Sequence, residues 1–379
     1  MKKQKICIIG DGLSGLTTAL ALKSPNLDVD LYYAKNKSKK IDKRITAISD
    51  SNFIFLKNLL NTNSKILFWT CKKIDLFYEN KKQYLNFLNF NGTKNALMHI
   101  FENNKIKNAL FKKIRLKDIK LVARKISKIN IKDTSIIVEK NKIFYDLIIM
   151  CLGAHSNLYN DFDRSRAVKK NYNEIAITGY VKHNLKLDNP KQYFLAEGPL
   201  AFLPFKRNSF SYVWSLNKDF YDHNKLNIKT VVKKRITNLI SKNSEIKLSN
   251  IQCYPIHLNL PFTYYKKNIT ILGEGLHSVH PIAGQGFNLV LRDISYLTNL
   301  IKKQLSLGLE IKNSTILNNF MQTRKPENII LSLGIDITNN FFKKNKILDP
   351  LKSKFLKNIS KFSSLKKISE LISNKGISI

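Results

Sequence analysis

Acidic residues are scarce in this chain of 379 residues: 27 aspartates and glutamates stand against 65 lysines and arginines, a formal net charge of +38. Such a charge ordinarily favours nucleic acid or an anionic membrane as partner. Arginine is scarce too, and occurs only at positions 44, 115, 124, 164, 166, 207, 235, 292 and 324. Lysine, asparagine and isoleucine are abundant together, as an AT-rich coding sequence would produce, whereas base-reading proteins favour arginine. We therefore expect no nucleic-acid partner.

Cysteines and long apolar runs are also few. The four cysteines, Cys7, Cys71, Cys151 and Cys253, are scattered without any C-x-x-C, which is typical of a reducing cytoplasm. No apolar run reaches the ~18 residues of a spanning helix, and the first strand leads into Gly-Asp-Gly, unlike a signal peptide. The sequence predicts a cytoplasmic protein that is long enough for two domains.

A glycine loop stands between the first two predicted strands, residues 6–9 and 29–33. It reads Gly10-Asp11-Gly12-Leu13-Ser14-Gly15 and opens a helical pattern. In a βαβ unit Gly10 allows the tight turn, Gly12 lets the backbone approach a pyrophosphate, and Gly15 lets helix and strand pack closely. We predict that the amides at residues 12–15 hold phosphates. The alternative is a glycine-rich turn without a ligand.

The acid that usually ends the second strand and holds the ribose hydroxyls is absent. Tyr33 occupies that place, followed by Ala34, Lys35 and Asn36. Tyr33 or Asn36 could hydrogen-bond a ribose, but neither does so as a carboxylate. We expect a lowered affinity for the dinucleotide.

A second glycine-rich stretch, residues 273–288, reads G-E-G-L-H-S-V-H-P-I-A-G-Q-G-F-N. It follows a predicted strand at 269–272 and precedes a helix with an apolar face formed by Phe287, Val290, Leu291, Ile294, Leu297 and Ile301. Ala283, Gly284 and Gly286 leave the amides at the start of this helix uncovered. Such amides suit the electron-rich pyrimidine edge of a flavin.

The same stretch holds His277 and His280, three residues apart. A catalytic zinc site needs a third ligand and a defined helix, and this loop offers neither. We therefore expect no metal.

The late stretch resembles the motif G-D-A-A-H-x-x-H-P-x-A-G-Q-G-x-N-L, followed by R-D, of the FAD-dependent aromatic hydroxylases of ubiquinone biosynthesis. These belong to the para-hydroxybenzoate hydroxylase superfamily. The residues in common are Gly273, His277, His280, Pro281, Ala283, Gly284, Gln285, Gly286, Asn288, Leu289, Arg292 and Asp293. Three further stretches are similar to that family: residues 42–49, around Arg44; the hairpin at 198–204 and 211–215; and the R-x-x-x-N of Arg324 and Asn328.

The glycine loops and the resemblance together imply a set of cofactor-binding residues: Gly10, Gly12, Leu13, Ser14, Gly15, Tyr33, Arg44, Gly273, Glu274, Pro281, Gly284, Gln285, Gly286, Phe287 and Asn288. No side chain is expected to act as a catalyst, because in this superfamily the flavin carries the chemistry. Two departures stand out. Glu274 replaces the family's aspartate, and Leu152-Gly153-Ala154-His155-Ser156 replaces a D-G motif linked to both FAD and NADPH. Because the acid of that motif is missing, we expect the altered motif to affect the reaction with NADPH.

The fold class that follows is α/β: a Rossmann-like FAD-binding domain with an inserted antiparallel β-sheet substrate domain and C-terminal helices. Residues 1–70, 95–165 and 262–330 would form the FAD-binding domain, residues 71–94 and 166–261 the substrate domain, and residues 331–379 the C-terminal helical region. In the substrate sheet Phe210, Tyr212, Trp214 and Leu216 alternate with smaller residues across from 200–205, which predicts a hairpin. One face of this sheet is either ordinary core or the wall of an apolar substrate cavity.

The region from Leu348 carries apolar residues at spacings of three and four: Leu351, Phe355, Ile359, Phe362, Leu365, Ile368 and Ile372. Lysines fall between them: Lys352, Lys354, Lys357, Lys361, Lys366 and Lys367. A basic amphipathic helix of this kind could lie on an anionic bilayer. It could equally pack on the flavin domain with a solvated lysine face.

The resemblance implies an FAD-dependent monooxygenase that uses NAD(P)H, with NADPH as the expected reductant, and O2 to hydroxylate the ring of a polyprenylated phenol in ubiquinone biosynthesis. The expected partners are that substrate, the surface of the inner membrane and other proteins of the pathway. Two alternatives stay open. One is a flavin-dependent reductase of a prenyl chain. The other is a non-catalytic scaffold of a membrane complex, which would explain the lost acids at Tyr33 and Leu152.

Overall fold

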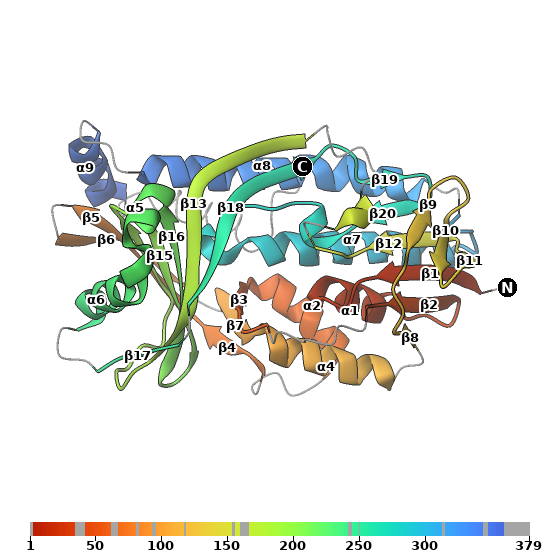
Figure 1. Cartoon of the computed structure of the whole chain (residues 1–379), viewed down its shortest axis with the longest axis horizontal. Helices are drawn as coiled ribbons and strands as arrows, with labels where there is room; N and C mark the ends of the chain where they lie inside the picture. Colours follow the sequence, from red (N-terminus) through yellow and green to blue (C-terminus); the bar gives the residue numbers. More distant parts are fainter. Residues whose placement is uncertain are drawn as a thin grey trace.

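A computed structural model describes residues 3–34, 42–61, 67–80, 83–92, 96–116, 119–153, 156–159, 167–241, 245–249, 251–312, 315–343 and 348–359. The predicted fold class is the one observed, with two large sheets at opposite ends of the molecule (Figure 1).

The first sheet is built on the apolar run at the start of the chain. Its order is β19-β20-β12-β1-β2-β8, and it is parallel except for the β19–β20 pair. The strands are β1 (Gln4–Ile9), β2 (Leu27–Tyr32), β8 (Lys120–Val122), β12 (Leu147–Met150), β19 (Tyr265–Lys266) and β20 (Ile269–Ile271). Because β1 is central and covered on both faces, Ile6 to Ile9 are buried as a continuous run.

Helices α1 (Leu13–Ala21), α2 (Asp50–Leu60), α4 (Asn103–Arg115) and α7 (Gly286–Ser306) pack around this sheet. A meander of β9 (Lys128–Asn130), β10 (Ser135–Val138) and β11 (Asn141–Phe144) lies between β8 and β12 in the chain. A third, small sheet has the order β3-β7-β4, from β3 (Ile45–Ile48), β4 (Trp69–Cys71) and β7 (Met98–Glu102).

The second large sheet has the order β17-β13-β16-β15-β14-β5-β6, and β18 pairs with β13. Its strands are β5 (Lys73–Asn80), β6 (Gln83–Asn91), β13 (Ala167–Lys182), β14 (Lys191–Leu195), β15 (Gly198–Lys206), β16 (Ser209–Asn217), β17 (Lys247–Leu248) and β18 (Gln252–Pro261). It is antiparallel apart from the β5–β14 pair. The long strands β13 and β18 run from this sheet towards the parallel one (Figure 1).

The predicted hairpin is formed by β15 and β16, and its aromatic face is core. Phe210, Tyr212, Trp214 and Leu216 are fully buried against Val232 and Ile236 of the helical cover. That cover consists of α5 (Lys218–Asn224), the short η2 (Lys225–Asn227) and α6 (Ile228–Ile240). Of the two readings left open for this face, ordinary core is the one observed.

Helix α8 (Ile316–Phe342) runs along the molecule from the parallel sheet to the second sheet (Figure 1). It contains residues 330 and 331, between which the sequence placed the start of the C-terminal helical region. Helix α9 (Asp349–Ile359) packs at the far end through Leu356, which is buried with Tyr78, Phe87 and Phe194. Lys352 is also buried, and its Nζ donates to the carbonyl of Lys343. The expectation that Lys352 belongs to a solvated lysine face is therefore wrong. Phe362, Leu365, Ile368, Ile372, Lys361, Lys366 and Lys367 lie outside the described residues.

Candidate functional site

Two helix starts meet at one cavity of about 640 Å³ between the sheets. Helix α1 begins after Gly12, and helix α7 begins after Gln285. Neither Gly12 nor Gln285 provides a side-chain cap. Both starts line the cavity, so free backbone amides and the positive ends of two helix dipoles face the same space. This arrangement suits a ligand with negative charge at two separate places.

The glycines of the first loop have different roles. A Cβ at Gly10 would lie 2.2 Å from the carbonyl oxygen of Cys151, and one at Gly15 would lie 1.9 Å from that of Gly10. Both positions therefore serve close backbone packing. At Gly12, by contrast, a Cβ would meet nothing within 4 Å, because this glycine borders the cavity. The open space at Gly12 is a cradle that a side chain would fill, as binding of a pyrophosphate requires.

Two cations stand near the α1 end of the cavity. Arg44 forms ion pairs with Asp42 at 2.9 Å and with Glu274 at 3.7 Å. The hydrogen bond with Asp42, with the charges of both carboxylates, holds the pKa of Arg44 above its ordinary value. Lys107 of α4 pairs with Asp11 of the glycine loop at 3.0 Å. Both cations line the cavity and complement a phosphate placed at the start of α1.

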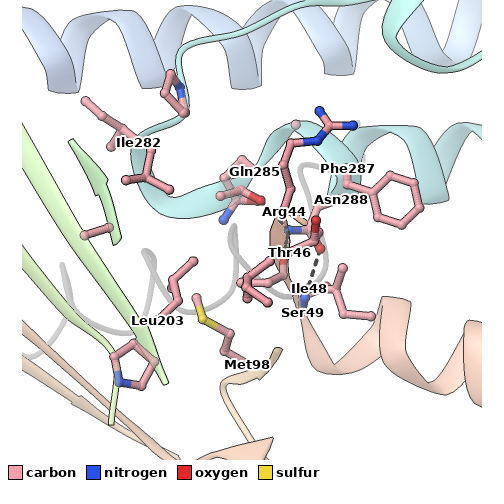
Figure 2. A pocket seen from close by; sticks show the side chains of 18 of the residues that line it. Arg44, Thr46, Ile48, Ser49, Met98, Leu203, Ile282, Gln285, Phe287 and Asn288 are labelled. Carbon is pink, nitrogen blue, oxygen red and sulfur yellow. Dashed lines mark hydrogen bonds between the residues drawn. The ribbon is translucent and has the colours of Figure 1, made fainter. Parts of the chain in front are cut away.

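The loop before α7 is held in place by Asn288. Its Oδ1 accepts from the backbone amide of Ser49 at 2.9 Å and from Nδ2 of Asn52 at 2.7 Å, while its own Nδ2 donates to the carbonyls of Ala47 and Gly284. Figure 2 shows the bond between Asn288 and Ser49 beside Gln285. The Asn288 amide thus forms its hydrogen bonds within the protein and fixes the loop.

The opposite wall of the cavity is apolar. Leu203 of the second sheet and Met98 of β7 face the loop that carries Ile282 and Gln285 (Figure 2). The sheet also gives Ile74, Leu76, Phe194, Ala201 and Val213 to this wall. One end of the cavity therefore suits a polar, anionic group and the other an apolar one.

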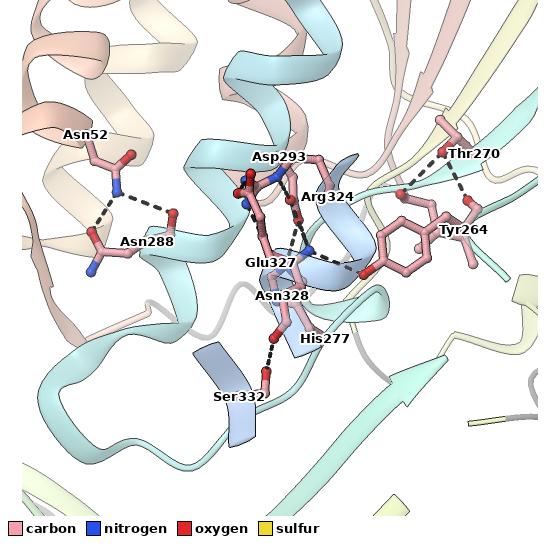
Figure 3. Close-up of polar contacts among 11 residues, drawn as sticks. Asn52, Tyr264, Thr270, His277, Asn288, Asp293, Arg324, Glu327, Asn328 and Ser332 are labelled. Carbon is pink, nitrogen blue, oxygen red and sulfur yellow. Dashed lines mark hydrogen bonds and ion pairs between the residues drawn. The ribbon is translucent and has the colours of Figure 1, made fainter. Parts of the chain in front are cut away.

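A buried polar network fixes the start of α7 to α8. Asp293 is fully buried and accepts hydrogen bonds from Nε2 of His277 at 2.6 Å, Nε of Arg324 at 2.7 Å and Nδ2 of Asn328 at 3.1 Å. Asn328 also donates to the hydroxyl of Tyr264 (Figure 3). Burial alone would raise the pKa of Asp293, but Arg324 and His277 hold it below its ordinary value. Arg324 and Asn328, the R-x-x-x-N of the sequence, therefore hold Asp293 in place by hydrogen bonds.

His280 joins the loop to the second sheet. Its Nδ1 accepts from the backbone N–H of Ile282, so Nε2 carries the proton and donates to Glu174 of β13 at 2.7 Å. Both side chains are buried. His277 and His280 thus serve two different carboxylates, and no cluster of metal-ligating side chains occurs within the described ranges.

Most of the residues expected at the cofactor lie together. Those that line the cavity are Gly12, Leu13, Ser14, Arg44, Glu274, Pro281, Gly284, Gln285, Gly286, Phe287 and Asn288. Gly10, Gly15 and Gly273 lie behind this lining; a Cβ at Gly273 would meet the side chain of Ser14 at 2.8 Å. Ala154, His155, Lys35 and Asn36 fall outside the described residues.

Tyr33 lies apart from the main cavity. It lines a separate hollow of about 460 Å³ with Phe111 and Arg115 of α4, and its ring meets the edge of Phe111 at 6.2 Å between centroids. Lys107 lies 5.8 Å from the Phe111 centroid and lines the main cavity, so this face of α4 runs from one hollow to the other.

The site contains residues that the sequence analysis missed. Lys107, Asn103 and Gln192 line the cavity, and Asn103 accepts from Thr46 at 2.6 Å and donates to Asp42 at 3.1 Å. Asn103 and Lys107 are four residues apart, a spacing that puts both on one face of helix α4. Nothing in the sequence shows that this helix docks beside the glycine loop. The uncapped helix starts, the cradle at Gly12 and the two cations fit FAD.

Comparison with known proteins supports this assignment. The squalene epoxidase family model matches residues 213–368. The ubiquinone biosynthesis monooxygenase COQ6 of Dictyostelium discoideum is 25% identical, over 90% of this chain and 85% of that protein. The 3-demethoxyubiquinol 3-hydroxylase of Escherichia coli is 26% identical, over 45% of this chain and 43% of its own length.

Solved structures show the same fold. The p-nitrophenol 4-monooxygenase PnpA of Pseudomonas putida superimposes with a TM-score of 0.78 at 13% identity, covering 100% of both chains. The tetrameric form of 2-methyl-3-hydroxypyridine-5-carboxylic acid oxygenase gives 0.70 at 14% identity, covering 95% of this chain and 96% of that one. These structures confirm the predicted fold, and the sequence relatives confirm the resemblance to the hydroxylases of ubiquinone biosynthesis.

Proposed function

We propose that this relative of the FAD-dependent aromatic hydroxylases of ubiquinone biosynthesis is an enzyme of the same kind. It hydroxylates the ring of a polyprenylated phenol, with NADPH as reductant and O2 as oxidant. One observation carries the proposal: a single cavity has two uncapped helix starts at one end and an apolar sheet at the other. Residues 1–70, 95–165 and 262–330 form the cofactor side on this view, and residues 71–94 and 166–261 the substrate side.

The chain's own groups would hold FAD along its length. The amides at the start of α1 face the pyrophosphate over Gly12, with Arg44 and Lys107 as counter-charges. Glu274 lies 3.7 Å from Arg44 and would accept a hydrogen bond from a hydroxyl of the ribityl chain. Tyr33 lies outside the main cavity, and on this proposal it would reach the ribose from the hollow that it shares with Phe111. Bound FAD would supply the redox chemistry, taking a hydride from NADPH and activating O2 for transfer of one oxygen atom.

The protein contributes charge stabilisation and exclusion of water. The uncapped amides at the start of α7 line the cavity and would stabilise negative charge on a reduced flavin, as preorganised donors do. Asn288 and the Asp293 network hold these amides in position. The apolar wall would exclude water from the site where the ring is bound.

A long prenyl tail places the substrate in a bilayer, and the structure has a surface suited to one. We define the α8–α9 face as Ile330, Leu333, Ile337, Phe341, Leu348, Leu351 and Phe355, all of them exposed. The rings of Phe341 and Phe355 meet at 6.2 Å, which joins the two helices' stripes into one face. Lys343, Lys354 and Lys357 lie in the same segments. Among the described helices, none has both the length and the hydropathy to cross a membrane. We propose that this face rests on the surface of an anionic bilayer.

The function is tested by spectroscopy and product analysis. Purified protein should carry a flavin spectrum, and NADPH should bleach it faster when a polyprenylated phenol is present. Mass spectrometry should then find a product with one more oxygen atom. Saturated prenyl double bonds would instead identify a prenyl reductase. A flavin-free protein with no turnover would identify the scaffold and refute the proposal.

A further inference from the structure

The apolar wall of the cavity contains one buried polar side chain, Gln192 of β14. In the ladder Gln192 lies opposite Ala201 of β15 and beside Leu76 of β5, and Ala201 in turn lies opposite Val213 of β16. Directly paired residues project from the same face of a sheet. Since Leu76, Ala201 and Val213 all line the cavity, the Gln192 side chain projects from the cavity face as well.

The neighbouring Lys191 projects from the other face. It pairs with Asp75 and Phe202, and its ammonium group lies 5.9 Å from the centre of the Phe77 ring. Phe202 belongs to the core beneath the helical cover, away from the cavity. Gln192 is therefore the polar group that β14 presents to the cavity.

No hydrogen bond joins the Gln192 amide to another described residue; only 7% of the residue is exposed, and its amide is open to the cavity rather than sealed in the core. Several other polar side chains of the lining are bonded within the protein. Thr46 donates to Asn103 at 2.6 Å, and Thr338 donates to the carbonyl of Gly334 at 2.8 Å. Burying an unpaired amide is unfavourable, and buried polar groups in folded proteins nearly always have a partner. A ligand in the cavity would supply that partner.

The wall around Gln192 is held rigidly. Phe194, two residues further on the same face, stacks on Phe342 of α8 with 3.6 Å between ring centroids. The ladder fixes the backbone of Gln192 between Leu76 and Ala201. An amide held in this way can orient a ligand with little loss of freedom on binding.

We infer that Gln192 positions the substrate ring by a hydrogen bond to the phenol hydroxyl. This inference rests on the proposed function, which supplies the phenol. A glutamine amide can accept the phenol O–H through Oε1 and donate to the phenol oxygen through Nε2. Lys191 also borders the cavity, but its side chain projects from the other face. The remaining described side chains that this sheet contributes to the lining are apolar: Ile74, Leu76, Phe90, Phe194, Ala201, Leu203 and Val213. Gln192 thus fixes which edge of the ring faces the sheet.

The test compares ligands with and without the hydroxyl, using FAD-loaded protein without NADPH. Binding of 2-geranylphenol and of geranylbenzene is followed by the change in the flavin absorption spectrum. Wild type should prefer the phenol, and in Gln192→Leu this preference should fall about tenfold, the value of one hydrogen bond. Gln83→Leu, the same substitution at an exposed glutamine of β6 that does not line the cavity, is the matched control and should keep the preference. FAD affinity, measured by fluorescence, should be the same in all variants.

A second variant and a second measurement secure the result. Gln192→Glu keeps an acceptor for the phenol proton and should restore most of the preference. In turnover, Gln192→Leu should send a larger share of the NADPH consumed to hydrogen peroxide, because a misplaced ring does not take the oxygen. An unchanged preference in Gln192→Leu overturns the inference alone. Wild type that holds FAD but binds neither ligand overturns the proposed function, and the inference with it.

Discussion

Single residues at the first glycine loop separate folding from cofactor binding. Gly12 has an extended backbone, φ −71° and ψ 176°, that any residue adopts, and a Cβ there would meet no atom within 4 Å. Gly12→Val should therefore fold, with a loss of about 1 kcal/mol or less from the poorer helix N-cap. Its branched side chain would occupy the space for the pyrophosphate, so FAD should be lost on purification. The ratio of flavin to protein absorbance measures this.

Gly10 provides the contrast in the same loop. It has φ +119°, and a Cβ would lie 2.2 Å from the backbone oxygen of Cys151. Gly10→Val should lower the yield of folded protein itself, as read by circular dichroism. If Gly12→Val keeps full flavin occupancy, the cradle at Gly12 does not hold the cofactor.

The same residues show what the sequence could predict. Gly12 and Arg44 were found because short-range spacing and a family motif mark them. Gln192 and Lys107 were missed because their placement depends on long-range geometry. Gln192 faces the cavity only because the strand register sets it between Leu76 and Ala201, and Lys107 reaches Asp11 only because α4 docks beside α1.

At the scale of elements, the fixed position of α7 depends on α8. Asp293 of α7 takes three hydrogen bonds in full burial, two of them from α8 through Arg324 and Asn328 (Figure 3). The helical spacing of the sequence predicts the apolar face of α7. It does not predict that Arg324 and Asn328 bond Asp293, because these residues lie more than 30 positions away in the chain.

Asp293→Asn tests this link. Asp293 and Glu327 both pair with the buried Arg324, so removing the Asp293 charge leaves Arg324 with Glu327 alone, and we expect a loss of up to about 3 kcal/mol in the free energy of unfolding. Urea denaturation measures it. The exposed pair of Asp28 with Lys3, at 3.6 Å, gives the control: Asp28→Asn should change the value by less than about 1 kcal/mol.

The variant also makes a prediction about pH. The pKa of Asp293 is held below its ordinary value in the folded protein, so the charged form stabilises the fold above the unfolded pKa of about 4. This part of the stability is lost as the pH falls through the lower, folded pKa. The difference in stability between wild type and Asp293→Asn should therefore shrink below about pH 4. A difference that stays constant from pH 7 to pH 3 would contradict the ion pair.

At the scale of the whole molecule, the amphipathic pattern predicted α9 but not which of its residues face outward. Leu356 turned inward to Phe194 and its neighbours, while Leu351 and Phe355 stayed 64% and 50% exposed. Phe194 lines the cavity and stacks on Phe342 of α8. The core that anchors α9 therefore lies directly behind the cavity wall, so a membrane on the α8–α9 face would be close to the site that receives a lipid substrate.

Vesicle sedimentation tests this arrangement. Lysines near an anionic bilayer attract it by about 1 kcal/mol each, an effect that salt screens, whereas inserted apolar side chains resist salt. Wild type should sediment with anionic vesicles at low salt and be released only in part at high salt. Leu351→Ser with Phe355→Ser should remove the salt-resistant part and leave the flavin spectrum intact, because both side chains are exposed.

Leu226→Ser, at an exposed leucine (99%) outside the α8–α9 face, is the matched control and should behave as wild type. Truncation of α9 is a poorer test, since it would also remove Leu356 from the core. If the double variant keeps salt-resistant binding, or if wild type ignores the vesicles, the α8–α9 face is not the membrane contact.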